Sequence, residues 1–370
     1  MQPAPAAVGI ALEEVDTPAL VLDLEVFEAN LGRMREAAPG RVRLRPHAKT
    51  HKCAEIARRQ LAAGAVGVCC QKVSEAEAMV AGAVGDVLVT NEIVGAQKLA
   101  RLAALARRAR IGVLADDPGN VRELQAAAAR AGAQLDVYVE LEVGGRRCGV
   151  APGAPALALA REIAASPNLR FAGLHAYHGR AQHVRPAAER RALVADAAAA
   201  VRKTRTLLEE ADIGCPIVTG AGTGTFVFEV ELGEWNEIQP GSYVFMDWDY
   251  ARNEWPEHAP RFGHALFVAS TVMSRPDART AIVDAGLKAY SVDSGMPAVW
   301  ERPGLALVQA SDEHGRIEGA PGAALPALGE KILLVPGHCD PTVNLYDWYV
   351  CVRAGRVEAL WRIEARGAVA

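Results

Sequence analysis

The sequence predicts an α/β protein in which a (β/α)8 barrel of the TIM type is followed by an antiparallel β domain. Up to residue 250, short apolar runs alternate with segments of helical period, a pattern typical of parallel strands joined by helices. Beyond residue 250, strand-like runs are separated by Gly, Pro and Asp, and no long helical segment interrupts them. The length of 370 residues accommodates a barrel and a smaller second domain.

Eight runs are the expected barrel strands, and helical stretches such as 94–108 and 186–210 lie between them. Eight is the number of strands that closes this type of barrel. An open, doubly wound sheet is the alternative. The expected strands are 42–49, 65–71, 86–91, 110–116, 135–143, 170–178, 215–222 and 236–245.

The domain limits follow from this change of pattern. The barrel is expected over residues 16–250 and the β domain over residues 251–370. The early run "DTPALVLDL" (16–24) resembles the strands of the β domain and could pair with them instead.

Composition narrows the class of protein. A net charge of −4, with 51% hydrophobic and 23% charged residues, gives no electrostatic case for binding nucleic acid or a membrane surface. The first 18 residues lack the basic start and apolar core of a signal peptide. The seven cysteines form no CxxC pair, so we expect reduced thiols in a cytoplasmic protein.

Barrel enzymes place their active sites at the C-terminal ends of the strands and often bind phosphate after strands seven and eight. Here "TGAGTGT" (219–225) ends the seventh expected strand and "PGS" (240–242) lies in the eighth. Glycines let backbone N–H groups turn toward an anion, and threonine hydroxyls add donors. The sequence therefore predicts a site for a phosphorylated small molecule.

Lys49, in "RPHAKTH" (45–51), ends the first expected strand on the same face. A lysine opposite a phosphate site is the arrangement that a pyridoxal phosphate (PLP) Schiff base needs. We expect His47 and His51, if charged, to lower the pKa of the lysine. The alternative for Lys49 is a phosphate contact in a sugar-phosphate enzyme.

Nine motifs, in order from residue 16 to the C-terminal region, carry a family resemblance. The chain resembles the fold-type III PLP enzymes of the alanine racemase-like barrel, and within them the D-threonine aldolase and D-serine dehydratase branch. The motifs are "DTPALVLDL", "RPHAKTHK", "CCQKVSEAE", "GGRRCGV", "AYHG", "TGAGTGT", "PGSYVFMD", "DAGLKA" and "PGHCDPT".

The resemblance implies a role for each of a set of residues. Lys49 would be the Schiff-base lysine, and the other residues would surround the ring or bind the phosphate. The ring residues are Gln71, Arg147, Tyr177 and Tyr250, and the phosphate residues are Gly222, Thr223, Gly224, Gly241 and Ser242.

The resemblance also implies a divalent metal site in the β domain, where "PGHCD" matches the family's pattern and His338 and Asp340 would be the ligands. On an extended segment, residues two apart face the same side, so we expect Cys339 to point away from the metal. The dehydratases of this branch generally have Cys at the position of Asp340 and bind zinc. An aspartate suits harder ions such as Mn²⁺ or Mg²⁺, and "DYARNEW" (249–255) also looks more like the aldolases.

By this resemblance the protein cleaves D-3-hydroxy amino acids, such as D-threonine or D-phenylserine, to glycine and an aldehyde. His51 or a metal-bound hydroxide would be the base. The alternatives are a dehydratase acting on D-serine or D-threo-3-hydroxyaspartate, a non-catalytic PLP carrier, and a racemase using Tyr243 or Tyr290. The resemblance also implies a head-to-tail homodimer.

Overall fold

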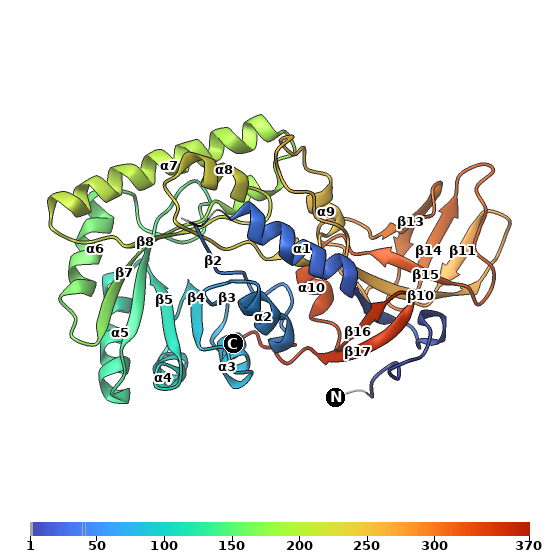
Figure 1. Ribbon diagram of the computed structural model, residues 1–370, viewed down its shortest axis with the longest axis horizontal. Coiled ribbons are helices and arrows are strands. Elements are labelled where there is room, and N and C mark those ends of the chain that lie inside the picture. Colours follow the sequence, from blue (N-terminus) through green and yellow to red (C-terminus); the bar gives the residue numbers. More distant parts are fainter. Residues whose placement is uncertain (1–2, 39, 41) are drawn as a thin grey trace.

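The computed structural model describes residues 3–38, 40 and 42–370. Two sheets organise this part of the chain, and Figure 1 shows them side by side along the long axis of the molecule. The first is surrounded by helices, and the second carries the C-terminal third of the chain. The fold class expected from the sequence is confirmed.

The first sheet has eight parallel strands in the order β2-β9-β8-β7-β6-β5-β4-β3. Its two ends meet at an isolated parallel bridge between His47 and Cys69, and the amide of Cys69 donates to the carbonyl of Pro46 at 2.8 Å. The strands therefore form a closed circuit. They are β2 (Arg43–Leu44), β3 (Val68–Cys70), β4 (Asp86–Glu92), β5 (Arg110–Ala115), β6 (Leu135–Glu140), β7 (Leu169–Ala176), β8 (Ile217–Gly220) and β9 (Glu237–Ile238).

Several of these strands are shorter than the sequence led us to expect. The expected strand 236–245 ends after Ile238, and a short 3-10 helix follows at Ser242–Val244. Pro240 has no N–H to donate to a neighbouring strand, so the ladder cannot continue through it. Similarly, the run 42–49 leaves the sheet after Leu44 except at the His47 bridge.

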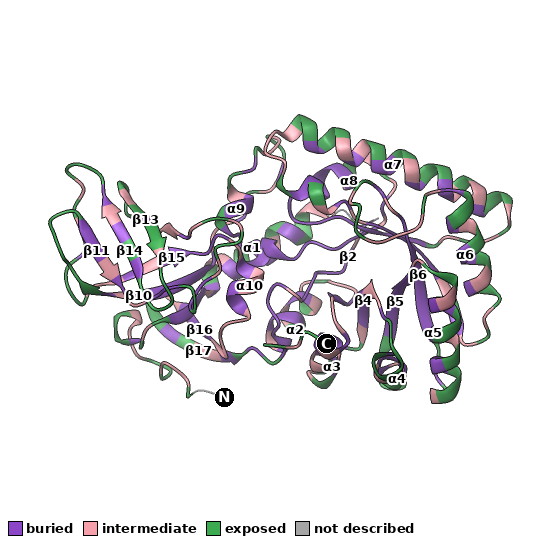
Figure 2. Ribbon diagram, turned by 180° about the vertical axis from the view of Figure 1, so that it is seen from behind, coloured by how far each residue is buried: buried purple, intermediate pink, exposed green. Residues whose placement is uncertain are grey.

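Helices cover the outside of the barrel, with exposed residues outward and buried residues toward the strands (Figure 2). Local signals set their ends. Asp117 caps α5 by accepting from the amide of Asn120 at 3.0 Å, and Gly132 ends it with a φ of 60°. The helices are α1 (Leu24–Ala37), α2 (Ala54–Ala62), α3 (Val73–Ala81), α4 (Ala96–Leu105), α5 (Pro118–Ala131), α6 (Ala154–Ala164), α7 (Ala187–Glu210), α8 (Phe226–Leu232) and α9 (Trp248–Ala251).

The second sheet has the order β13-β14-β11-β10-β1-β16-β17, and β15 pairs with β10 and β12. Its first strand, β1 (Ala19–Asp23), comes from the N-terminal region; it lies antiparallel to β10 and parallel to β16. The remaining pairs are antiparallel. The other strands are β10 (Leu266–Ser274), β11 (Thr280–Val283), β12 (Ala298–Val299), β13 (Leu305–Ala310), β14 (Gly315–Gly319), β15 (Lys331–Val335), β16 (Trp348–Arg353) and β17 (Arg356–Arg362).

A short helix, α10 (Cys339–Val343), connects the second sheet to the mouth of the barrel. The amide of Cys339 donates to the carboxylate of Asp247 at 3.3 Å, and the amide of Trp248 donates to the carbonyl of Pro336 at 2.9 Å. These bonds hold the start of α10 against α9. Among the described residues, no helix combines the length and the apolar character that crossing a bilayer requires.

Candidate active site

A pocket opens where the strands of the barrel end. It contains Lys49 and most of the residues that the sequence analysis singled out for a cofactor. Its lining residues are His47, Lys49, Thr50, Gln71, Thr90, Arg147, His175, Tyr177, Ala221, Gly222, Thr223, Gln239, Gly241, Ser242 and Tyr250.

Lys49 lies in a tight turn directly beyond the bridge at His47, not at the tip of a strand. The turn is closed by the amide of Lys52, which donates to the carbonyl of Ala48 at 2.7 Å. The side chain of Lys49 is 40% exposed and forms an ion pair with Asp340 of α10. The barrel and the second domain therefore meet at this lysine.

The pKa of Lys49 is shifted in the opposite direction from the one that the flanking histidines led us to expect. Burial lowers it, but the Asp340 carboxylate outweighs burial and raises the pKa above its ordinary value. The histidines are not cationic neighbours, because burial lowers the pKa of His47 well below its usual range and that of His51 to about 4. The expectation was wrong because sequence adjacency does not reveal burial or the distant carboxylate.

The far end of the pocket fits a phosphate group. In the described residues, the amides of Gly222 and Thr223 have no protein acceptor. The hydroxyl of Thr223 accepts from the amide of Tyr243 at 3.1 Å, which leaves its own proton free to donate. Gly241 must be a glycine, because a Cβ there would lie 2.5 Å from the hydroxyl oxygen of Thr50.

Gly224 differs from the other residues predicted to bind phosphate, because its amide already has a protein acceptor. Its amide donates to the side-chain oxygen of Gln182 at 3.0 Å, and it does not line the pocket. A Cβ at Gly224 would meet the carbonyl oxygen of Gln182 at 2.3 Å. This glycine is therefore needed for close packing against Gln182, and its role as a phosphate ligand stays a prediction.

The residues expected around the cofactor ring all reach the pocket, each held by a protein contact. The ring of Tyr250 stacks on His183 with centroids 5.2 Å apart. The guanidinium of Arg147 lies 5.7 Å from the centre of the Tyr177 ring. Gln71 donates to the carbonyl of Thr90 at 3.1 Å.

The proposed metal ligands lie beside Lys49. The Nε2 atom of His338 is 4.0 Å from Oδ2 of Asp340, close enough for one ion to contact both at the usual distance of about 2.0–2.2 Å. The other oxygen of Asp340 is buried without a partner. Although burial raises the pKa of Asp340, Lys49 and His338 hold it well below its usual range. The donor set fits a divalent ion.

The segment that carries these ligands is not extended, contrary to expectation. His338, in extended backbone, directly precedes α10, and Asp340 lies in the first turn of this helix. The two side chains converge because the chain turns into a helix between them. Cys339, between the two ligands, is buried, and burial raises the pKa of its thiol.

Sequence reasoning missed several residues of this site. Asp293 accepts from Nδ1 of His338 at 2.8 Å, which leaves Nε2 free to bind a metal. Asp247 is buried, which raises its pKa to about 7. Asp247 and Thr50 lie inside two of the quoted motifs, but nothing in these motifs assigned them a role. No motif includes Asp293, Thr90 or Gln239, and His175 was detectable as a polar strand end.

Three further candidates do not line the pocket. His51 is fully buried, and its Nδ1 accepts from the amide of Cys53 at 3.2 Å, so its role as a base stays a prediction. The hydroxyl of Tyr243 accepts from Gln60 at 3.3 Å on α2. Tyr290 is buried in the second domain. In this chain neither tyrosine reaches the pocket as a racemase would require.

Comparisons with known proteins identify aldolases that are similar to this chain over nearly its whole length. The D-threonine aldolase of Arthrobacter sp. is 50% identical over 99% of this chain and 96% of its own length. The 3-hydroxy-D-aspartate aldolase of Paracoccus denitrificans (strain Pd 1222) is 43% identical over 98% and 95%. The crystal structure of D-threonine aldolase from Filomicrobium marinum has a TM-score of 0.98 and 52% identity, covering 99% of this chain and 100% of that one.

A dehydratase is a more distant relative. The D-threo-3-hydroxyaspartate dehydratase of Delftia sp. (strain HT23) is 29% identical over 94% of this chain and 97% of its own length. Two family models also match: "Alanine racemase, N-terminal domain" over residues 22–248, and "Putative serine dehydratase domain" over residues 265–352. The chain belongs to the alanine racemase N-terminal domain family of PLP-dependent barrels, and its close homologues are aldolases.

Proposed function

We propose that this protein cleaves the Cα–Cβ bond of D-3-hydroxy amino acids, of the D-threonine or D-phenylserine type, to glycine and an aldehyde. PLP and a divalent ion, Mn²⁺ or Mg²⁺, would be its cofactors. The observation that carries the proposal is the contact between Lys49 and Asp340. It brings the only lysine that lines the described pocket next to a carboxylate of the candidate metal site.

The two ends of the pocket would bind different parts of the cofactor. The amine of Lys49 would bond to the cofactor aldehyde, and the loop at Gly222–Thr223 would anchor the phosphate through its free amides. Bound PLP would accept the electrons left on Cα when the bond breaks. Arg147 and Tyr250 would hold the ring between these anchors.

His338 and Asp340 would direct the substrate. An ion held by them would supply the positive charge that lowers the pKa of the β-hydroxyl. Asp293 would keep His338 in the tautomer that presents Nε2. His51 is the candidate base that takes the hydroxyl proton. We also propose that the protein is cytoplasmic and works as a homodimer.

The competing function is elimination of water by a dehydratase, and residue 340 argues against it. The aspartate there is an oxygen ligand suited to hard ions, whereas zinc is favoured by thiolate.

Product analysis separates the two functions. With PLP and Mn²⁺ present, we expect D-threonine to give equal amounts of glycine and acetaldehyde, measured by amino-acid analysis and aldehyde trapping. L-threonine is the matched control and should give neither product. Formation of 2-oxobutanoate and ammonia would instead establish the dehydratase.

The phosphate site makes a separate prediction. Thr223→Ala removes one donor to a charged acceptor and should weaken PLP binding by about 1.5–3 kcal/mol, roughly ten- to a hundredfold. A fluorescence titration with PLP measures this, and the exposed Thr206→Ala variant on α7 is the control. Equal affinities for PLP in the two variants would contradict the assignment.

A further inference from the structure

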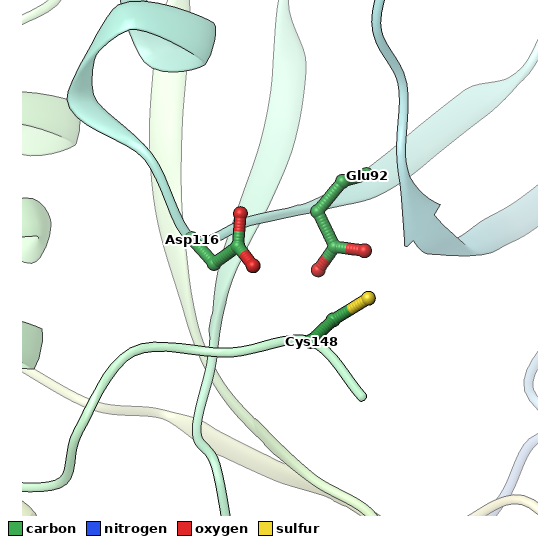
Figure 3. A group of neighbouring side chains, drawn as sticks. All are labelled: Glu92, Asp116 and Cys148. Carbon is green, nitrogen blue, oxygen red and sulfur yellow. The ribbon is translucent and has the colours of Figure 1, made fainter. Parts of the chain in front are cut away.

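An acidic cluster lies beside the cofactor pocket and takes no part in the chemistry described above. Glu92 ends β4, Asp116 follows β5, and Cys148 lies next to Arg147 in the loop after β6. Figure 3 shows their side chains pointing toward one another, and their ligand-type atoms all lie within 4.8 Å of each other.

A third carboxylic acid connects this cluster to the pocket. Glu140, at the end of β6, is only 3% exposed. Its Oε1 atom lies 3.6 Å from the guanidinium of Arg147 and 3.8 Å from Nδ1 of His175. Both of these residues line the pocket. Glu140 therefore contacts the pocket wall from behind.

Two buried carboxylate oxygens here have no donor group of the protein to accept from: Oε2 of Glu140 and Oε1 of Glu92. Burial, followed by a side-chain hydrogen bond with Glu140 and the charge of Glu140, raises the pKa of Glu92 to about 7. Two ionised carboxylates only accept hydrogen bonds, so a bond between them requires a proton on one. A proton on one of the two carboxyl groups would make it a donor to the other.

The neighbouring groups favour a proton over a metal ion at this position. Asp116 already accepts from the amide of Gly149 at 2.9 Å. Burial and the charge of Glu92 raise the pKa of Cys148 to about 11, so its sulfur is a protonated thiol and not a thiolate ligand. The positive charge of Arg147 beside Glu140 also disfavours a second cation.

We propose that Glu92 and Glu140 share one proton at neutral pH, and that this carboxyl pair positions Arg147 in the pocket. The role of Arg147 rests on the proposed function; the shared proton does not. In this arrangement Glu140 stays ionised toward Arg147 because Glu92 carries the proton on its other side. The protons belong to the pair, as in other coupled carboxyl groups.

The proposal predicts how the site responds to pH. The groups that face Glu92 are Glu140 from β6, Asp116 after β5, and Cys148 with Arg147 from the loop. Once Glu92 loses its proton, three carboxylates share one guanidinium, and like-charge repulsion disturbs the contact between Glu140 and Arg147. PLP binding should then weaken as the pH rises through about 7.

The contribution of Glu92 to folding stability should also decrease as the pH rises. The pKa of Glu92 is raised in the folded protein from 4.5 to about 7, so the folded state binds more protons between these values. Stability from this group is therefore present below about 4.5, falls as the pH rises toward 7, and changes no further above it.

Infrared spectroscopy tests the shared proton directly. We expect the carbonyl band of a protonated carboxyl group to titrate near pH 7 in the wild type and one such group to be missing in Glu92→Gln. In Glu140→Gln the same band should titrate at a lower pH, because the charge of Glu140 no longer raises the pKa of Glu92. Burial also raises the pKa values of Glu229 and Asp247 to about 7. The titration of Glu92 is therefore obtained by subtracting the spectra of Glu92→Gln from those of the wild type. Superimposable titrations would overturn the proposal.

PLP binding tests the positioning of Arg147. The dissociation constant is measured at about pH 6 and about pH 8.5, on either side of the Glu92 pKa. We take the ratio of the dissociation constant at the higher pH to that at the lower pH. This ratio should be at least about fivefold larger in the wild type than in Glu92→Gln. Asp277→Asn, in an exposed loop outside the cluster, is the control and should keep the wild-type ratio. Equal ratios in wild type and Glu92→Gln would refute the positioning role.

Metal analysis provides the third outcome. A stoichiometric divalent ion that is lost in Glu92→Gln but kept in Asp340→Asn would overturn the proposal, because an ion would then neutralise the pair. If the wild-type protein fails to bind PLP, the proposed function and the role of Arg147 fall together. The infrared titration would still decide whether the proton is shared.

Discussion

Replacing Lys49 with alanine is expected to abolish cleavage of D-threonine, with a loss of roughly 10³- to 10⁶-fold in kcat, as found when the nucleophile of a covalent mechanism is removed. The reason is that Lys49 is the only lysine lining the pocket in the described part of the chain. Aldehyde release under saturating D-threonine measures the effect. The exposed Lys98→Ala variant on α4 should keep full activity.

Covalent attachment provides an independent check on Lys49. Borohydride reduction of the PLP-loaded wild type, followed by peptide mapping, should place the label on Lys49, and Lys49→Ala should carry none. Lys52 is three residues away, but it is buried and paired with Glu75, so it is a stringent internal control. A label on Lys52 or Lys72 would show that the assignment of Lys49 is wrong.

Removing the metal is expected to have the second large effect. Chelation, or the substitution Asp340→Asn, should reduce aldehyde release roughly 10³-fold or more, because a Lewis-acid ion contributes several kcal/mol to the transition state. PLP should stay bound to Lys49 in the chelated enzyme, since the pocket that holds it contains neither metal ligand. Adding Mn²⁺ should restore activity to the chelated wild type only.

Asp340 touches Lys49 as well as the metal site, so a second variant is needed to separate the two roles. His338→Gln leaves the Lys49 contact in place, and it should also lose metal-dependent activity while keeping PLP. Asp277→Asn, in an exposed loop, is the control. Asp340→Cys should shift the preference toward zinc, because thiolate is the softer ligand. Full activity after chelation would remove the metal from the proposed reaction.

Much of the fold could be predicted from the sequence because its signals are local. Apolar runs and helical periods predicted the eight barrel strands and the β-rich C-terminal region. The long helix expected at 186–210 is α7, Ala187–Glu210. Strand ends were less predictable, as Pro240 illustrates, because hydrogen bonding to the neighbouring strand decides where a ladder stops.

Part of the candidate site was also detectable locally. The Gly-Thr loop at 219–225 and Lys49 follow expected strands, and parallel strands bring their C-terminal ends to one face. The structure places both in one pocket. Gly224 shows the limit of this reasoning. The sequence does not reveal whether a glycine is required for close packing, as against Gln182 here, or for contact with a phosphate.

The sequence by itself therefore determined the fold class, the phosphate-type loop and the candidate lysine, since short-range pattern and strand order are enough for these. Only the tertiary structure decided the partners: Lys49 meets Asp340 across 291 positions, His338 meets Asp293, and Glu140 reaches Arg147 from behind the pocket. These contacts join segments that are far apart in the sequence, so no local sequence pattern predicts them. They reverse the expected shift in the pKa of Lys49 and raise that of Glu92, because the pKa of a group depends on burial and on nearby charges in space.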